Sequence, residues 1–153
     1  MAERFRLPFL HLGEMVYKDA PEPAAIPPAC AVMALSSLIS LPGRVKAQRA
    51  VAATYDATVP VSRRISPVPH SRPSWLRYAV RVGERVVIPK ELGILRPYPA
   101  TLAEQRHIGA VICDREPDMP GARTLRQELV TLPTHELMSR ADVEHVRRWL
   151  ERV

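Results

Sequence analysis

The stretch "GARTLRQELVTLPTHELMSRADVEHVRRWL", residues 121–150, carries the densest set of local structural signals in the chain. Its first half has apolar residues spaced along one helix face: Ala122, Leu125 and Leu129. Leu132-Pro133 is expected to end this helix, because the residue before a proline avoids helical backbone angles. The stretch therefore predicts a helix, a tight proline turn and a second helix.

The second helix has a well-defined start. Ser139 is a favoured N-cap residue, and Asp142 follows at the capping-box position. Apolar residues then recur at helical spacing: Val143, Val146, Leu150 and Val153. Basic residues occupy the last turns, where positive charge suits the helix dipole: Arg147, Arg148 and Arg152.

Residues 29–59 predict helical structure in two parts. In "ACAVMALSSLISL" the apolar side chains form one helix face or more: Val32, Leu35, Leu38, Ile39 and Leu41. In "RVKAQRAVAATYDATV" a second stripe follows: Val45, Ala52, Tyr55 and Val59. Pro42-Gly43 stands between them, and two alternatives are open, a kink within one helix or a full turn between two.

The segment "WLRYAVRV", residues 75–82, alternates with the period of a half-buried strand. One side holds Leu76, Tyr78, Val80 and Val82, and the other holds Arg77, Ala79 and Arg81. After a turn at Gly83-Glu84, "RVVIP" is expected to form a second short strand, which Pro89 restricts to an edge or an end. "ELGILRPYP" predicts a short helical turn ending at Gly93 and then an extended segment, and another helix is expected to start near Leu102.

These elements predict an α+β fold, with a small antiparallel sheet of about two or three strands packed against about four helices. The 153 residues are enough for one ordinary domain. Residues 1–28 include the four prolines of "DAPEPAAIPPA", residues 19–29, and are expected to form an irregular, stiff lead-in. Residues 29–153 are expected to form the domain.

The chain is basic and rich in proline. It has a net charge of +6, 16 prolines and only 6 glycines, so its loops are expected to be stiff. Of its 22 basic residues only three are lysines, and the arginines are scattered singly or in pairs. Aromatic residues make up 5% of the chain, and no nucleic-acid-binding motif is present. A nucleic-acid partner is therefore not expected.

The cysteines and the N-terminus favour a cytoplasmic protein. Cys30 and Cys113 are isolated, and a reduced, buried pair is expected, with a single disulfide as the open alternative. The N-terminal "MAERFRLPFLHLGEM" has no apolar stretch of signal-peptide length. No run approaches the ~18 apolar residues of a transmembrane helix, so no membrane partner is expected.

From Ala29 to Val153 the sequence resembles the C-terminal small domain of the DegT-type sugar aminotransferases. These are pyridoxal-phosphate enzymes of fold type I that aminate keto-sugar nucleotides. Residues 29–59 resemble the long helix that leads out of the family's large domain, and "LRYAVRV" resembles its first small-domain strand. "LGILRPYPATLAEQ" resembles the segment in which a Gly-Ile pair precedes a Tyr-Pro, and residues 121–150 resemble the closing helices with their Leu-Pro-x-His turn.

The resemblance leaves out the family's catalytic large domain. That domain holds the lysine that forms the Schiff base and the residues that bind the cofactor. This chain has only Lys18, Lys46 and Lys90, and none stands in the family's Ser-x-x-(His/Asn)-x-Lys context. No catalytic residue is therefore predicted. No cofactor is expected to bind this chain alone, and pyridoxal phosphate is expected only with a catalytic partner chain.

The resemblance implies three substrate-binding candidates, Arg96, Tyr98 and His135. Arg96 and Tyr98 match the region where the family's small domain faces the mouth of the active site, and an arginine there can bind a diphosphate. The alternative leaves Arg96 in solvent and packs Tyr98 under a proline. His135 would reach toward the cleft or, alternatively, stabilise the turn through the backbone. No metal site is predicted, since three histidines share no ligand spacing: His70, His107 and His145.

Three functions are left open. The first is a subunit or split half of a pyridoxal-phosphate-dependent transaminase, which is not self-sufficient and needs the large domain in trans. It predicts an exposed apolar patch of interface size. The second is a non-catalytic remnant or protein-interaction module, which predicts a sealed monomer or self-association. The third is a basic polyanion-binding protein, which predicts a continuous arginine face and salt-sensitive binding.

Overall fold

Two strands that are distant in the sequence form the sheet. The computed structural model describes residues 25–104 and 119–153. In it β1 (Arg77–Arg81) pairs antiparallel with β2 (Leu129–Pro133). Tyr78 lies opposite Leu132, and Val80 lies opposite Val130. Both pairs share one face of the sheet, because successive side chains of a strand alternate between faces.

Residues 129–133 are a strand and not the end of a helix, which corrects the prediction for this stretch. Helix α3 spans Pro120–Glu128, and the backbone of Leu129 is already extended (φ −71°, ψ 126°). Val130 and Thr131 are β-branched and favour a strand. Their pairing with β1 outweighs the helical spacing of the residues before them.

Each edge of this sheet carries one further bridge, from Arg64 to Val80 beside β1 and from Leu95 to Thr131 beside β2. The amide of Leu95 donates to the carbonyl of Thr131 at 3.1 Å, and the amide of Thr131 donates back at 2.8 Å. The strand predicted at residues 85–89 is not formed in the described chain. Its apolar residues Val86 and Ile88 pack against the core without strand pairing.

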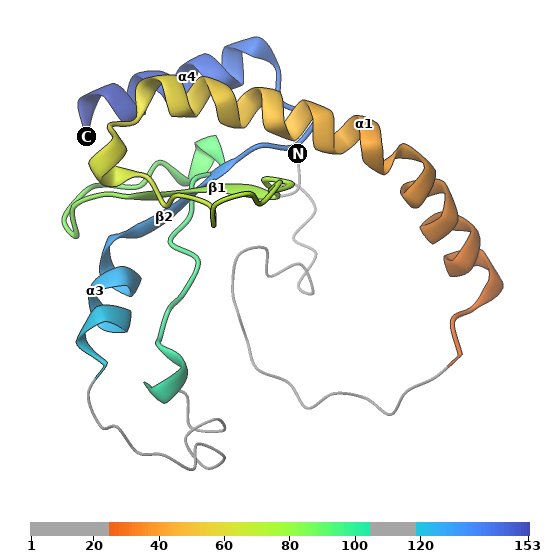
Figure 1. Ribbon diagram of the computed structural model, residues 1–153, viewed down its shortest axis with the longest axis horizontal. Coiled ribbons are helices and arrows are strands. Elements are labelled where there is room, and N and C mark those ends of the chain that lie inside the picture. Colours follow the sequence, from red (N-terminus) through yellow and green to blue (C-terminus); the bar gives the residue numbers. More distant parts are fainter. Residues whose placement is uncertain (1–24, 105–118) are drawn as a thin grey trace.

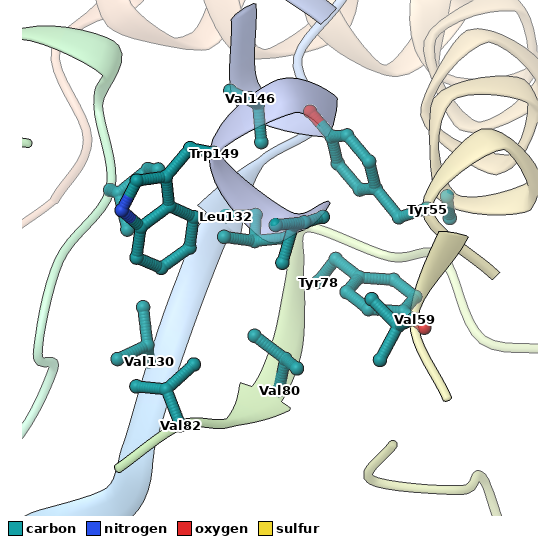
Figure 2. Close-up of a cluster of buried hydrophobic side chains, with 12 residues drawn as sticks. Tyr55, Val59, Tyr78, Val80, Val82, Val130, Leu132, Val146 and Trp149 are labelled. Atoms are coloured by element: carbon teal, nitrogen blue, oxygen red, sulfur yellow. The ribbon is translucent and has the colours of Figure 1, made fainter. Parts of the chain in front are cut away.

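The core lies between one face of the sheet and two helices, α1 (Pro28–Thr58) and α4 (Arg140–Arg152) (Figure 1). Figure 2 shows its side chains converging from these elements. The buried members are Ala52, Tyr55, Val59, Tyr78, Val80, Val82, Ile94, Val130, Leu132, Val146, Trp149 and Leu150. The hydroxyl of Tyr55 donates to the carbonyl of Pro133 at 3.0 Å, which ties α1 to the end of β2.

The alternation predicted for β1 is largely confirmed. Tyr78, Val80 and Val82 are buried on the core face. Leu76 was expected to join them but is exposed, because it lies at a bend ahead of β1.

Helix α1 is continuous through Pro42, so the structure has one helix here and not two. Its C-terminal half packs on the core through Gln48, Ala52 and Tyr55. Its N-terminal half projects away from the sheet (Figure 1), and residues 28–44 are exposed. Cys30 lies in this half and is exposed, which corrects the expectation that it is buried.

By length and composition, α1 is able to cross a membrane. The expectation that no stretch of this kind exists is therefore not confirmed, since α1 continues through Pro42. Core helices and signal sequences pass the same test, so this finding alone assigns no membrane location.

Helix α4 begins as predicted. The amide of Asp142 donates to the Ser139 hydroxyl at 3.2 Å, and the Asp142 carboxylate accepts from the Ser139 amide at 2.8 Å. The buried face consists of Val146, Trp149 and Leu150, with Val143 partly buried. Val153 is exposed, because it follows the last helical residue.

Short turns complete the described chain: η2 (Val61–Arg63), η3 (Lys90–Leu92) and η4 (Leu102–Glu104). Turn η3 ends at Gly93 in the left-handed conformation (φ 71°), as the predicted helical turn requires. The helix expected near Leu102 is described only as η4, since residues 105–118 lie outside the described chain. The α+β class, with a small antiparallel sheet against helices, is confirmed. The boundary at residue 28 stays a prediction, since residues 1–24 lie outside the described chain.

Candidate functional site

Tyr98 lines a cavity of about 380 Å³ between η4 and α3. The residues that line it come from two segments, 98–103 and 119–126: Tyr98, Ala100, Thr101, Leu102, Ala103, Met119, Ala122, Leu125 and Arg126. Most of these side chains are apolar, and Tyr98 is 50% exposed. The cavity therefore offers an apolar floor with a few polar groups at its edge, an arrangement typical of small-molecule sites.

Arg126 is the charged group of this cavity. Its Nη1 donates to the carbonyl of Pro99 at 2.8 Å, while its Nε is buried and has no hydrogen-bond partner among the described residues. Nε lies 3.9 Å from Glu104 Oε2. The amide of Thr101 donates to the same carboxylate at 2.8 Å. This backbone hydrogen bond, together with Arg126, lowers the pKa of Glu104.

Arg96 lies on the same segment as Tyr98, but its guanidinium binds the protein. It donates to the carbonyls of Gly83 and Glu84 at 3.1 and 2.9 Å, and to the carbonyl of Gln127. These contacts join the end of α3 to the turn after β1. Arg96 is therefore held in place by carbonyls at the position predicted for diphosphate binding, and its substrate role stays a prediction.

His135 is exposed in the turn between β2 and α4. Its carbonyl accepts from the amide of Met138 at 3.2 Å. Arg96 bonds the chain just before β2, and His135 follows the other end of this strand. Tyr98 lines the smaller cavity and Arg96 does not, so the structure does not bring the three candidate side chains together in one described site. The role of His135 as a substrate-binding residue stays a prediction.

A second cavity, of about 560 Å³, lies where η3 meets α4. It is lined by Pro89, Glu91, Leu92, His145, Arg148, Trp149, Glu151 and Arg152. Its α4 wall carries two arginines and one glutamate beside His145 and Trp149, and Arg148 pairs with Glu144 at 3.1 Å. Sequence analysis missed this cavity and also missed Arg126 in the first. No local spacing signals either one, because each is assembled from segments distant in the chain.

The described lysines do not fit a pyridoxal-phosphate site. Lys46 lies exposed on α1 and Lys90 lies exposed at the start of η3, and neither lines a described cavity. A Schiff-base lysine needs an enclosed pocket that also holds the cofactor ring and phosphate. Lys18 lies outside the described residues. Within residues 25–104 and 119–153, no group of three or more His, Cys, Asp and Glu is arranged to hold a metal ion.

Arginine side chains bind backbone carbonyls throughout the described chain. The donors are Arg49, Arg63, Arg64, Arg77, Arg96, Arg126 and Arg152. Some acceptors lie in a proline-rich segment, as for Arg49 with Arg72 and Pro73, and others lie at the ends of helices and strands, as for Arg63 with Arg81. Carbonyls at both kinds of place lack some partners from regular structure, and a buried carbonyl needs a donor. These contacts explain part of the arginine content without an anion-binding surface.

No family model and no curated protein matches the sequence. Solved structures do match it. DesV of S. venezuelae, solved in complex with a ketimine intermediate, matches over 99% of this chain with a TM-score of 0.69 and 20% identity. The aminotransferase TlmJ from Streptoalloteichus hindustanus matches over 80% with a TM-score of 0.62 and 25% identity. A DegT DnrJ EryC1 StrS aminotransferase from Brucella abortus matches over 77% with a TM-score of 0.62 and 19% identity.

The chain has the fold of part of a DegT-type aminotransferase. This confirms the resemblance expected from the sequence. The aminotransferase-like chain spans 43%, 35% and 33% of the lengths of these three proteins. The larger share of each matched protein therefore has no counterpart here.

Proposed function

We propose that this chain acts as the small-domain part of a DegT-type sugar aminotransferase, together with a separate catalytic chain. Two observations support the proposal. The fold match covers 99% of this chain, and the chain covers only 43% of the matched protein. The catalytic chain would supply the Schiff-base lysine and hold pyridoxal phosphate, which carries out the amino-group transfer when bound. The complex is proposed to be cytoplasmic and to act on a keto-sugar nucleotide, as the sequence resemblance implies.

In this proposal the chain contributes binding surfaces and no catalytic group. Tyr98 and Arg126 are proposed to face the substrate from the smaller cavity, with the Tyr98 hydroxyl and the Arg126 Nε as hydrogen-bond donors. Arg96 is proposed to hold the Tyr98 segment against α3 through its carbonyl contacts.

The exposed half of α1 favours an associating chain over a sealed monomer. Its large apolar side chains are exposed over residues 32–41: Val32, Met33, Leu35, Leu38, Ile39 and Leu41. Monomeric soluble proteins rarely expose a contiguous patch of this kind. The alternative of a non-catalytic interaction module is supported by the same patch, and only the cofactor content of the complex separates the two.

The polyanion-binding alternative has less support. A binder of this class needs arginine side chains free to reach phosphates. Many arginines of the described chain donate to backbone carbonyls instead, among them Arg64 and Arg77.

The experiment is a pull-down from the organism that encodes the chain, with the tagged full-length chain as bait. The eluate is examined by mass spectrometry for a second chain and by absorbance for bound pyridoxal phosphate. We expect a cofactor-bearing chain that lacks its own small domain. Recovery of the bait alone, colourless and self-associated, would overturn the split-enzyme proposal and leave the interaction module.

A further inference from the structure

The larger cavity, where η3 meets α4, combines an apolar surface with charged side chains. Its apolar lining residues are Pro89, Leu92 and Trp149, and each is at least partly buried. Trp149 is only 5% exposed, and its Nε1 donates to the carbonyl of Val87 at 3.4 Å, so the indole is held in place. A volume of about 560 Å³ lies in the range of small-molecule sites. The cavity therefore offers a fixed apolar surface that is large enough for a small ligand.

Two of the charged lining side chains already have partners within α4. Arg148 pairs with Glu144 at 3.1 Å, and Glu151 pairs with Arg147. Glu144 and Arg147 do not line the cavity. The charges of Arg148 and Glu151 are therefore balanced by side chains outside it.

Arg152 and Glu91 are the charged lining residues that have no ion pair within the described chain. The Nε of Arg152 donates to the Arg148 carbonyl at 3.2 Å, which leaves its two Nη atoms free. Glu91 makes no hydrogen bond or ion pair with a described residue. Arg152 comes from α4 and Glu91 from η3, the two elements that meet at the cavity. The cavity thus has one free positive and one free negative group beside its apolar surface.

This combination disfavours ligands with a single charge and ligands with none. A simple anion would meet the carboxylates of Glu91 and Glu151, and it would lie near the C-terminal end of α4, where the helix dipole opposes negative charge. A simple cation would meet Arg148 and Arg152. An uncharged apolar ligand would cover charged groups without pairing them, which costs free energy.

We infer that this cavity binds a small apolar zwitterion, of the kind found in a free α-amino acid or a short peptide with free ends. The ligand carboxylate pairs with the Nη atoms of Arg152, whose planar fork suits a carboxylate. The ligand ammonium group pairs with Glu91, and the apolar side chain covers Leu92 and Trp149. The inference does not rest on the proposed function, because every group that it uses belongs to this chain.

The first experiment follows binding to the purified, isotope-labelled full-length chain by NMR. The probes are L-leucine and L-leucyl-L-leucine, and the tighter of the two shows whether the cavity takes an amino acid or a peptide. The indole N–H signal of Trp149 is expected to shift on binding. That of Trp75, which lies ahead of β1 and lines neither described cavity, is the internal control.

Two half-molecules of leucine test the need for both charges. The compound 4-methylpentanoate lacks the ammonium group, and 3-methylbutylamine lacks the carboxylate. We expect each to bind about ten-fold more weakly than L-leucine or worse, because each leaves one charged group of the cavity unpaired. Equal binding of 4-methylpentanoate and L-leucine would overturn the inference in favour of a simple anion site.

Substitutions then assign the two charged groups. Glu91→Gln and Arg152→Gln are each expected to weaken binding of L-leucine about ten-fold, since each removes one charge-assisted contact. The matched controls are Lys90→Gln on η3 and Arg140→Gln on α4, which are exposed and do not line the cavity. Both controls should bind within about two-fold of the parent. The double variant Glu91→Arg, Arg152→Glu should bind L-leucine more tightly than either single reversal, because a zwitterion can bind in the opposite direction.

The inference fails if the Glu91 and Arg152 variants bind as the parent does. It also fails if neither zwitterion shifts the Trp149 signal up to about 10 mM, ten-fold above a millimolar Kd. For any variant whose spectrum is no longer that of the folded chain, the comparison of L-leucine with its two half-molecules on the parent chain decides. None of these results changes what the pull-down recovers, so failure of this inference and failure of the proposed function are distinguishable.

Discussion

The hydroxyl of Tyr78 on β1 donates to the carboxylate of Asp56 on α1 at 2.7 Å. This hydrogen bond joins the sheet to the helix at the edge of the core, where the Tyr78 ring stacks on Trp75 with a centroid distance of 5.1 Å. Burial, and then the Asp56 carboxylate, raise the pKa of Tyr78 above its usual value of 10.0. The contact therefore links stability of the fold to the protonation of one side chain.

Tyr78→Phe removes this hydrogen bond and keeps the ring. We expect the free energy of unfolding to fall by about 1.5 kcal/mol, as for a hydrogen bond to a charged acceptor. Urea unfolding measures the change, and Tyr98→Phe, at a half-exposed ring, is the control expected to have little effect. Equal losses in both variants would contradict a specific role for the contact.

The same pair predicts a loss of stability at high pH. A folded pKa above the unfolded one means that the stabilisation is complete below pH 10.0 and is lost as the pH rises through the folded value. The parent chain should therefore lose stability above pH 10 more steeply than Tyr78→Phe. The unfolding free energies of both chains, measured between pH 8 and 11, test this. If they fall in parallel with pH, the linkage is contradicted.

Arg96→Ala separates a structural from a substrate-binding role. The guanidinium donates hydrogen bonds to the carbonyls of Gly83, Glu84 and Gln127, and its removal leaves these carbonyls without that donor. We expect a loss of about 1–3 kcal/mol in unfolding free energy, and only partial rescue by Arg96→Lys, which lacks the planar fork. A variant with full stability but weaker binding of a sugar nucleotide by the complex would support the substrate role instead.

Two glycines predict opposite responses to alanine. Gly93 has φ 71°, so Gly93→Ala strains the backbone even though its added Cβ would have ordinary contacts with Pro133. We expect a loss of about 1 kcal/mol or more in the unfolding free energy. Gly43 lies inside α1 with open space around it, so Gly43→Ala should stabilise the helix locally by up to about 1 kcal/mol. Denaturation measures the first change, and hydrogen exchange of residues 30–42 measures the second.

Ser139→Ala removes the side-chain half of the α4 capping box. A cost of about 1 kcal/mol in unfolding free energy is expected at neutral pH. The Ser139 hydroxyl and amide hold the pKa of Asp142 below its usual value of 3.8. Stability from this contact is present above that value and is lost as the pH falls through the lower folded pKa. The parent should therefore lose more stability than Ser139→Ala between pH 4 and 2, and an unchanged difference would contradict the linkage.

Sequence analysis predicted those features that depend on neighbours along the chain. The cap at Ser139, the alternation of Tyr78, Val80 and Val82, and the helical turn that ends at Gly93 each follow from local geometry, and the structure has all three. It failed at residues 129–133, where helical spacing continues past Leu125 but pairing with β1 prevails. It also failed for "RVVIP", whose alternation finds no strand partner in the described chain.

The candidate site shows the same division. Tyr98 was identified from a local resemblance, and it lines a cavity. Arg126, which brings the charge to that cavity, comes from α3 and has no sequence signal that connects it to Tyr98. The carbonyl partners of Arg96 are likewise set by contacts between distant segments.

By itself, the sequence determined the α+β class, the cap of α4 at Ser139 and the resemblance to DegT-type aminotransferases, because these depend on residue spacing and local hydrogen bonding. Only the tertiary structure decided that residues 129–133 are a strand, that α1 runs unbroken through Pro42, and that residues 28–44 of this helix are exposed. Those outcomes depend on which distant segments bury one another. The free energy of such burial and pairing exceeds the local preferences that a sequence pattern records.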